Sequence, residues 1–228
     1  MREDPELLRR YAEQASDEAF AELVRRHLNL VYSVALRQVS GDAHLAEDVT
    51  QQVFAALARK ATRLSGRASL SGWLYRSTHF AASDVVRAER RRKTRERESL
   101  LMQPTTHPPV PVDWEHVRPI LDTVIAELGE RDRDAVSLRF LDGRSFADIA
   151  ARLRLSENAA RMRVERALDK LHAALARRGI TSTTAAVGLA LAAQVSTAAP
   201  AGLATSVTGL ALAGTASGGG LALLGFSP

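Results

Sequence analysis

Apolar residues recur every three or four positions over most of the first 178 residues, which is the spacing of amphipathic α-helices. The strict alternation of apolar and polar residues that marks strands is nearly absent. The pattern predicts three long helices in the first hundred residues, with apolar stripes that begin near Phe20, Ala46 and Leu70. It predicts more helices between about Val117 and Arg178. The expected fold class is therefore all-α.

The clearest local pattern lies between Ser145 and Leu171, where two short apolar stripes are joined by a tight turn. Ser156 follows the turn and can cap the second helix by accepting a backbone N–H. These helix and turn lengths fit a helix-turn-helix, in which arginines on the second helix pair with guanine or neutralise phosphates. The alternative is an ordinary helical hairpin with a solvated basic face. The polar side chains on that second helix are Asn158, Arg161, Arg163 and Arg166.

Proline and charge divide the chain into four zones. Prolines cluster in residues 99–115, which predicts a semi-extended linker. The linker separates a first helical domain, 5–98, from a second, 116–178, that holds the helix-turn-helix. The remaining zone, 179–228, contains no charged residue and is rich in Ala, Gly, Leu and Thr.

Basic residues are in modest excess, 31 against 26 acidic ones, but they are clustered. Seven of the eleven residues from Arg87 to Arg97 are basic, and aromatic side chains stand just before them at Trp73, Tyr75 and Phe80. Aromatic residues beside a basic groove hold unstacked single-stranded bases while the cations neutralise the backbone. For Trp73 a core position is the favoured interpretation. The basic run itself favours contact with nucleic acid.

A third constellation is AEDVTQQVF, residues 46–54. Asp48 and Gln51 share one helical face, whereas Val53 and Phe54 belong to the apolar stripe. From spacing alone, a partner-binding helix and a plain surface helix are equally good interpretations.

The order of these parts resembles an extracytoplasmic-function (ECF) sigma factor, the minimal two-domain type that directs bacterial RNA polymerase to promoters. DEAFAELVRRHLNLVYSVALR resembles the opening helix of its sigma-2 domain, and AEDVTQQVF resembles its polymerase-docking helix. SLSGWLYRSTHFAASDVVRAERRR resembles the promoter-melting segment. ELGERDRDAVSLRFLDGRSFADIAARLRLSENAARMRVERALDKL resembles the sigma-4 domain. The resemblance covers about Asp17 to Arg178 and departs from the family at Gln52, where an acidic residue is usual, and at Arg154, where glycine is common. A residue other than glycine must therefore take the turn conformation at position 154.

The resemblance implies a sigma-2-like domain and a sigma-4-like domain, and it implies roles for individual residues. Docking on the polymerase β′ clamp helices is implied for Asp48, Gln51, Val53 and Phe54. Opening and holding the minus-10 element is implied for Trp73, Tyr75, Arg76, His79, Arg87, Arg90 and Arg91. Recognition of the minus-35 element is implied for Ser156, Asn158, Arg161, Arg163 and Arg166. The implied partners are core RNA polymerase, through its clamp helices and β flap, promoter DNA, and an anti-sigma factor that the sequence does not identify.

An enzyme is not expected, because the sequence shows no phosphate-binding loop, no nucleophile elbow and no set of histidines at metal-ligand spacing. The absence of cysteine excludes disulfides and thiolate metal sites, and no cofactor is expected. No signal peptide is visible, so a cytoplasmic protein is expected. Two alternatives stay open: a stand-alone helix-turn-helix regulator and a membrane-linked signalling adaptor.

The uncharged tail allows three interpretations: a disordered extension, a weakly membrane-associated segment, or a strip that folds against the two domains or a partner. Its best apolar windows, 185–195 and 201–213, are shorter than the roughly 20 residues of a membrane span. The first and third interpretations are favoured over a span. Because each domain has its own apolar stripes, we expect neither to need the tail to complete its core.

Overall fold

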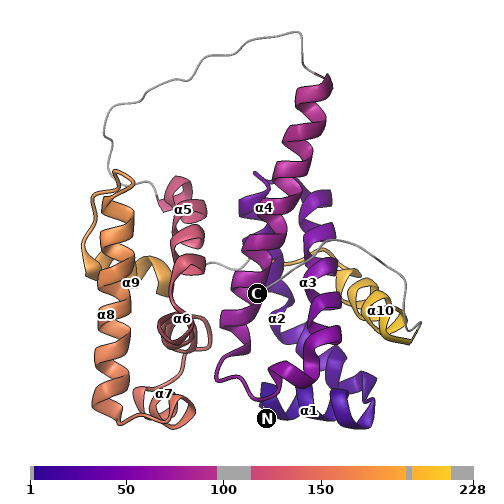
Figure 1. The fold of residues 1–228 in the computed structure, drawn as a ribbon, viewed down its shortest axis with the longest axis horizontal. Coiled ribbons are helices and arrows are strands. Elements are labelled where there is room, and N and C mark those ends of the chain that lie inside the picture. Colours follow the sequence, from indigo (N-terminus) through magenta and orange to yellow (C-terminus); the bar gives the residue numbers. More distant parts are fainter. Residues whose placement is uncertain (1–2, 97–113, 194–196, 217–228) are drawn as a thin grey trace.

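The computed structural model describes residues 3–96, 114–193 and 197–216 of the chain, and these residues form helices without any strand (Figure 1). The all-α prediction is confirmed. The linker prediction falls almost wholly on residues 97–113, which lie outside the described residues. The helices are α1 (Asp4–Gln14), α2 (Asp17–Gln38), α3 (Ala43–Leu64), α4 (Leu70–Glu96), α5 (Trp114–Glu127), α6 (Glu130–Val136), the π-helical turn η1 (Ser137–Leu141), α7 (Phe146–Leu153), α8 (Glu157–Ala176), α9 (Thr184–Ala192) and α10 (Leu203–Ala216).

The first domain consists of α1 to α4, which pack around a core of apolar side chains from the predicted stripes. Phe20 and Phe54 are completely buried in this core. Side-chain caps fix where two of the helices begin: Ser16 accepts the backbone N–H of Ala19, and Asp42 accepts that of Leu45. The long helix α4 continues beyond the packed part of the domain and carries the basic run with it (Figure 1).

The second domain consists of α5 to α8 and contains the predicted helix-turn-helix in α7 and α8. Ser145 and Asp148 form a reciprocal capping box at the start of α7, and Ser156 caps α8 by accepting the N–H of Ala159 at 3.2 Å. Arg154 ends α7 in the left-handed conformation, with φ of 55°. The expectation that a residue other than glycine takes this conformation is therefore confirmed.

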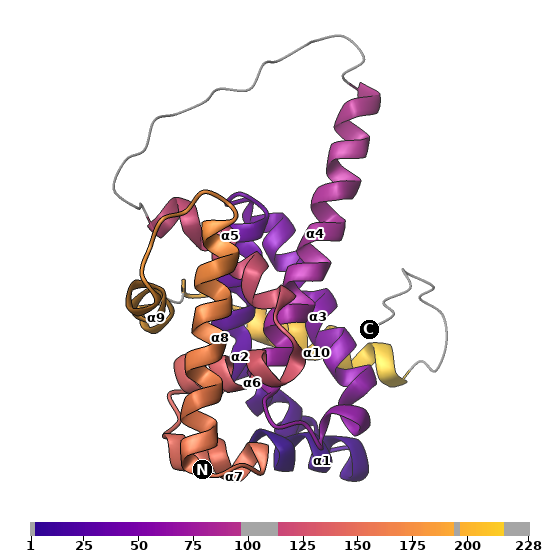
Figure 2. The same cartoon turned by 60° about the vertical axis from the view of Figure 1, so that its left-hand side comes forward.

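The two domains lie against each other, with α5, α6 and η1 packed on α2 and α4 (Figures 1 and 2). Val34 and Tyr75 of the first domain belong to the same apolar cluster as Val117 and Leu121 of the second. Polar contacts cross the same boundary, including the 3.0 Å hydrogen bond from the Gln38 side chain to the Pro119 carbonyl. The molecule is therefore in a closed arrangement.

The tail folds onto both domains, as the third interpretation of its sequence predicted. Helix α9 packs against α8 and η1, while α10 packs along α3 and α2 (Figure 2). Side chains of the tail also join both apolar clusters, whereas the expectation that neither domain needs the tail stays a prediction. The side chains that do so are Val187 and Leu191 on one core and Leu203, Val207 and Ala211 on the other. Within the described residues, no helix is both long enough and apolar enough to cross a bilayer.

Candidate nucleic-acid interface

The exposed face of α8 carries two of the three arginines that the sequence singled out. Arg161 lies in the second turn of the helix and Arg166 lies further along it, and both side chains are exposed. Asn158 is exposed at the start of the same helix, next to the capping Ser156. A helix that begins at a tight turn and exposes amide and guanidinium groups near its N-terminus can place them against base edges in a major groove.

Local contacts hold these arginines at the surface without removing their charge. The Arg161 guanidinium stacks over the Phe146 ring of α7, 4.8 Å from its centroid, and is 3.8 Å from a carboxylate oxygen of Glu157. The Arg166 side chain donates a hydrogen bond of 3.1 Å to the Met162 carbonyl one turn earlier. Both guanidinium groups keep donors that can turn towards a ligand.

Arg163 does not lie on this exposed face, and its predicted contact with the minus-35 element stays a prediction. Its side chain turns towards α6, where its guanidinium lies 3.4 Å from one carboxylate oxygen of Asp132, whose other oxygen faces Lys170. The reason is helical geometry, because three residues after Ala160 a side chain returns to the inward side of the helix. The positions that are exposed beside Arg161 and Arg166 are instead Met162 and Glu165, which an angular count along α8 would have identified.

Tyr75 of α4 is fully buried, because α5 covers it. Its hydroxyl donates a hydrogen bond to the carboxylate of Asp122, which is itself fully buried. Arg37 of α2 donates two hydrogen bonds to the same carboxylate, 2.8 and 3.1 Å long. Burial alone would lower the pKa of Arg37, but the hydrogen bonds and the charge of Asp122 outweigh that effect and raise it.

His79 and Arg76, on the turns around Tyr75, also face the second domain. Burial lowers the pKa of His79, against the opposing effect of the negative charges of Asp122 and Glu127 on α5. Its buried Nδ1 has no hydrogen-bond partner among the described residues. The Arg76 guanidinium lies 5.2 Å from the centre of the Phe80 ring, which is partly exposed. The structure therefore brings Tyr75, Arg76 and His79 together, on a face that the second domain covers.

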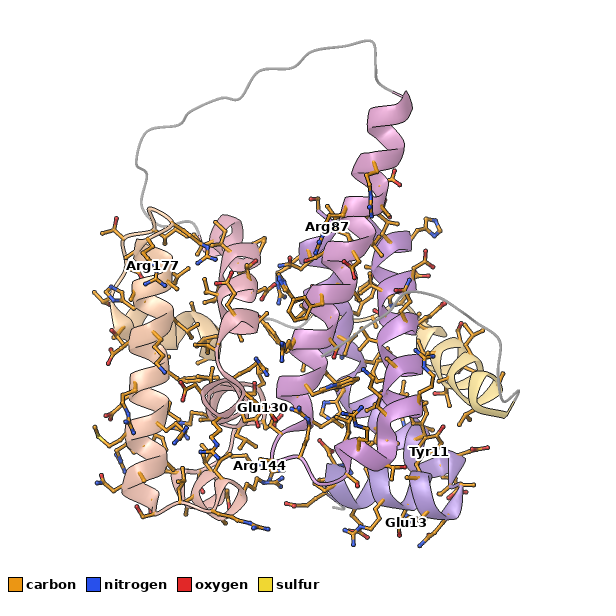
Figure 3. The ribbon with its side chains drawn as sticks, in the orientation of Figure 1. Tyr11, Glu13, Arg87, Glu130, Arg144 and Arg177 are labelled. Atoms are coloured by element: carbon orange, nitrogen blue, oxygen red, sulfur yellow. The ribbon has the colours of Figure 1, made fainter. Side chains whose placement is uncertain are left out.

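The other residues assigned to α4 lie elsewhere. Trp73 is half-buried and packs against the core of the first domain, in agreement with the core position favoured from the sequence. Arg87 and Arg91 are both exposed on the C-terminal half of α4. Figure 3 shows Arg87 near the level at which α4 extends past the other helices. Arg87 is 3.4 Å from an Asp84 oxygen one turn away. Arg90 is within α4, but its side chain lies outside the described residues.

The proposed docking helix α3 divides its four assigned residues into two pairs. Asp48 is exposed and Gln51 is half-buried, so both can be reached by a partner. Val53 and Phe54 have 2% and 0% of their surfaces exposed and belong to the core of the first domain. Direct contact of these two with a partner is therefore corrected to a packing role, in which they hold α3 in place.

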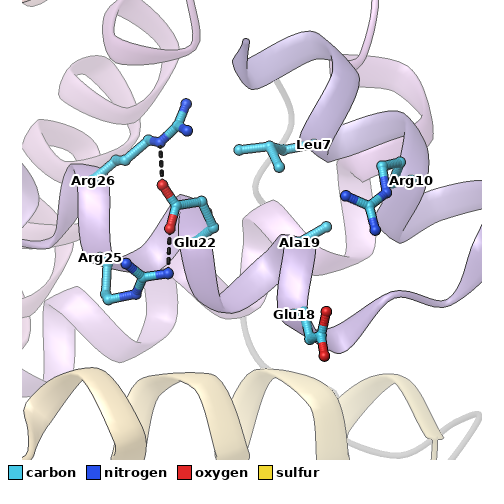
Figure 4. A pocket seen from close by; sticks show the side chains of 7 residues that line it. All are labelled: Leu7, Arg10, Glu18, Ala19, Glu22, Arg25 and Arg26. Carbon is cyan, nitrogen blue, oxygen red and sulfur yellow. Dashed lines mark hydrogen bonds and ion pairs between the residues drawn. The ribbon is translucent and has the colours of Figure 1, made fainter. Parts of the chain in front are cut away.

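A hollow of about 400 Å³ lies between α1 and α2, on a different part of the surface (Figure 4). Three of its charged side chains pair with one another: Glu22 faces both Arg25 and Arg26, and the bond from Arg26 is 2.7 Å long. Within the described residues, no three His, Asp or Glu side chains gather as metal ligands would. Among the surfaces that the sequence singled out, α8 and the C-terminal half of α4 carry exposed cations on an ordered helix.

Comparison with known proteins shows that these two surfaces lie within two known sequence modules. Residues 23–92 match the family model of Sigma-70 region 2, and residues 118–171 match that of Sigma-70, region 4. The first range contains α3 and most of α4, and the second contains the helix-turn-helix and most of α8. The chain belongs to the ECF sigma factor family. These matches confirm the resemblance inferred from the sequence. Members of that family are transcription initiation factors rather than enzymes.

Individual sigma factors are similar over most of the chain. ECF RNA polymerase sigma factor SigE of Mycolicibacterium smegmatis is 31% identical over 174 residues, and RNA polymerase sigma factor CarQ of Myxococcus xanthus is 31% identical over 164. Both alignments cover 72% of this chain, but they cover 65% of SigE and 92% of CarQ. ECF RNA polymerase sigma-E factor of Escherichia coli K12 is 29% identical over 170 residues. The chain therefore spans slightly less than two thirds of SigE and most of CarQ.

For a sigma factor, the polar bonds between the two modules are the feature that sequence reasoning missed. Asp122 and Arg37 were not singled out, although they form the centre of the buried network with Tyr75. The one available signal was an aspartate in a mainly apolar stretch, ILDTVIAEL. A charged residue at a core position of a helix needs a partner, and here that partner comes from the other domain.

Proposed function

We propose that this chain binds core RNA polymerase, recognises the minus-10 and minus-35 elements of a set of promoters, and starts transcription at them. The observation that carries the proposal is the exposed face of α8, where Asn158, Arg161 and Arg166 stand on a capped helix within a region 4 module. This face has the length, the charge and the donors that readout of a DNA major groove requires.

The minus-35 element is assigned to α8. Residues near the N-terminus of a recognition helix reach base edges, whereas residues further along it meet the phosphates. Asn158 and Arg161 are therefore proposed as base readers and Arg166 as a phosphate contact. Ser156 acts through its cap, since its hydroxyl is already used to fix the start of the helix.

The minus-10 element is assigned to α4. Tyr75, Arg76 and His79 would stack on and hydrogen-bond an unpaired base, and Arg87, Arg90 and Arg91 would hold the neighbouring backbone. The closed arrangement hides the first group, because Tyr75 is buried under α5. Binding at this face therefore requires the second domain to move away from α4.

Docking on polymerase is assigned to the exposed side of α3, with Asp48 and Gln51 as contacts to the β′ clamp helices. The second module is assigned to the β flap. An anti-sigma factor is proposed as a further partner that binds these same surfaces. Such a protein works where its polymerase is, which places it in the cytoplasm. Together these assignments predict a protein that selects promoters only in complex with core enzyme.

The experiment that tests the proposal is run-off transcription with purified core polymerase on promoters recovered by genomic selection. We expect specific transcripts with the full chain, and their loss with Arg161→Ala at physiological salt. Glu13→Ala, an exposed change on α1, is the matched control and should leave transcription intact. A stand-alone regulator would instead bind duplex DNA tightly without polymerase and would not start transcripts. That result would overturn the proposal.

A further inference from the structure

The tail contacts each domain through a different helix. Helix α9 buries Val187 and Leu191 in the cluster of the second domain, and the Thr184 hydroxyl donates a 3.2 Å hydrogen bond to Asp169 of α8. Helix α10 buries Leu203 and Val207 in the core of the first domain. The closed arrangement is therefore held by a segment that lies outside both matched modules.

Hydrogen bonds fix the crossing from one domain to the other. The Arg118 guanidinium of α5 donates to the Ala193 carbonyl at 3.4 Å. The Ser33 hydroxyl of α2 donates to the Thr197 carbonyl at 3.1 Å, and the Ala199 N–H donates to the Asn29 side chain at 3.0 Å. The tail is thus pinned to the second domain at Ala193 and to the first domain from Thr197 onward.

The chain between the two anchored points, Ala193 and Thr197, is too short to allow the two domains to separate widely. Ala193 and Thr197 are four residues apart, so the chain between them extends to at most about 14 Å. Promoter elements one and a half turns apart are separated by roughly 50 Å. A tail with both anchors in place therefore prevents the two domains from spreading to that spacing, and one anchor must release first.

The boundary between the domains is suited to opening. Buried polar atoms on both sides of it lack a hydrogen-bond partner among the described residues, including His79 Nδ1, Arg76 Nε and Asp134 Oδ1. Burying such groups costs free energy that hydration returns when the surfaces part. Because the connection between them is short, the apolar contacts of α9 and α10 cannot both persist when the domains separate widely, so together they favour the closed form.

We propose that residues 184–193 and 197–216 form an intramolecular clasp, which holds the second domain over α4 and hides Tyr75, Arg76 and His79 until α10 leaves α2 and α3. The meaning of this closure for promoter binding rests on the proposed function, but the clasp itself does not. Helix α10 lies on α3, the helix assigned to polymerase docking.

The test measures the distance between the domains in the full chain by Förster transfer. The chain has no cysteine, so a Glu13→Cys, Arg177→Cys protein takes dyes only at two exposed sites, one on each domain (Figure 3). In this background Val207→Glu places a charge in the buried face of α10, whereas Leu210→Glu places the same charge on a side chain that is 54% exposed. We expect the transfer efficiency to fall at least twofold with Val207→Glu and to stay at the parent value with Leu210→Glu.

A second variant guards against damage to the core of the first domain. Asn29→Ala with Ser33→Ala removes two hydrogen bonds to the tail and leaves every apolar side chain in place. It should also lower the transfer efficiency, with unchanged helix content by circular dichroism. Parent-like efficiency in both Val207→Glu and the double variant would overturn the clasp.

A binding measurement separates the clasp from the proposed function. Fluorescence anisotropy with a pool of single-stranded DNA should show at least tenfold tighter binding to Val207→Glu than to the parent or Leu210→Glu. If the transfer efficiency falls while DNA binding does not change, the clasp stands and the role assigned to the α4 face is wrong. If the efficiency does not fall, the clasp is wrong, whatever the chain does with polymerase.

Discussion

The Tyr75 hydroxyl of α4 donates a hydrogen bond to the Asp122 carboxylate of α5 across the boundary between the two domains. Both side chains are fully buried, and Arg37 completes the network from α2 with hydrogen bonds of 2.8 and 3.1 Å. One carboxylate of the second domain thus binds two helices of the first. The tyrosine assigned to promoter melting therefore also bonds to the second domain in the closed form.

Asp122→Ala should separate the domains. The substitution removes the acceptor for both Arg37 and Tyr75, and a buried cation without its partner costs about 3–5 kcal/mol. Arg37 can avoid most of this cost if α5 moves away and water reaches the guanidinium. We therefore expect opening rather than global unfolding, seen as faster hydrogen exchange in α5 with protection retained in α2 and α3.

Tyr75→Phe is the matched control for that experiment. It removes one hydrogen bond and keeps the ring and the Arg37–Asp122 pair. Its effect should be about 1 kcal/mol, the usual net value of one hydrogen bond. An Asp122→Ala protein whose α5 exchanges no faster than that of Tyr75→Phe would contradict the assigned role of the carboxylate.

The arginines of α8 should separate into three kinds by substitution. If Arg161 reads a base, Arg161→Ala should cost about 1–3 kcal/mol and relax the preference at one promoter position. Arg166→Ala should weaken binding to all sequences alike and reduce the salt dependence by about one phosphate contact. Measuring promoter affinity at several salt concentrations distinguishes the two results.

Arg163→Ala serves as the internal comparison on the same helix. Its partner Asp132 keeps Lys170, 2.5 Å away, so the substitution leaves no unpaired buried carboxylate. We expect little change in either promoter preference or salt dependence. A loss of base preference with Arg163→Ala, but not with Arg161→Ala, would mean that α8 turns in the groove differently from the present assignment.

The helices and the helix-turn-helix were predictable because each depends on local sequence. Ser156 caps α8, and Arg154 takes the left-handed turn conformation, as the sequence indicated. The inward direction of the Arg163 side chain does not follow from its basic character alone. It follows from its angular position on α8. An angular count places it beside Ala160 and Ala167.

The contacts between the domains could not be predicted, because they depend on tertiary packing. Tyr75 and Asp122 lie 47 residues apart, and no local spacing relates them. The tail could not be predicted for a different reason. Alanine, leucine and glycine occur on every side of α9 and α10, so the sequence of these helices defines no single buried face. Only the packed structure shows that Val207 is buried while Leu210 is exposed.

The two pairs of residues on α3 should behave differently towards polymerase and towards denaturant. Asp48→Arg with Gln51→Ala changes accessible side chains, so we expect weaker binding to core polymerase with stability within about 0.5 kcal/mol of the parent. Phe54→Ala removes a fully buried ring and should cost about 3–5 kcal/mol of stability. Urea unfolding and a core-binding titration measure the two effects separately.

Glu13→Arg is the charge-matched control for the first of these changes. It reverses an exposed acidic residue on α1, a helix to which no polymerase contact is assigned, and should not affect the affinity for core polymerase. Equal affinities of the parent, the Asp48→Arg, Gln51→Ala protein and the control would refute the docking assignment, provided that circular dichroism shows all three to be folded.

The buried carboxyl of Asp134 should make stability depend on pH. This residue of α6 lies at the domain boundary, where a Cβ added at Gly72 would stand 2.8 Å from its Oδ1. Burial raises the pKa of Asp134 to about 6, against the lowering effect of the positive charges of Arg67 and Arg133. The pKa in an unfolded chain is about 3.9, so between pH 4 and 6 the folded protein binds the extra proton.

The sign of the effect follows from that difference in proton binding. The contribution of Asp134 to the free energy of unfolding is most favourable near pH 4 and is lost as the pH rises through about 6. Asp134→Asn keeps a neutral side chain of the same shape, so it should remove this dependence and stabilise the protein at pH 7 by on the order of 2 kcal/mol. Urea unfolding at pH 5, 6 and 7 measures the effect. The difference in stability between variant and parent should grow across this range, because only the parent loses the contribution of Asp134. Other carboxyls with shifted pKa values, such as Asp142 and Asp148, affect both proteins alike. A constant difference over the range would show that Asp134 is already charged in the folded protein at pH 5.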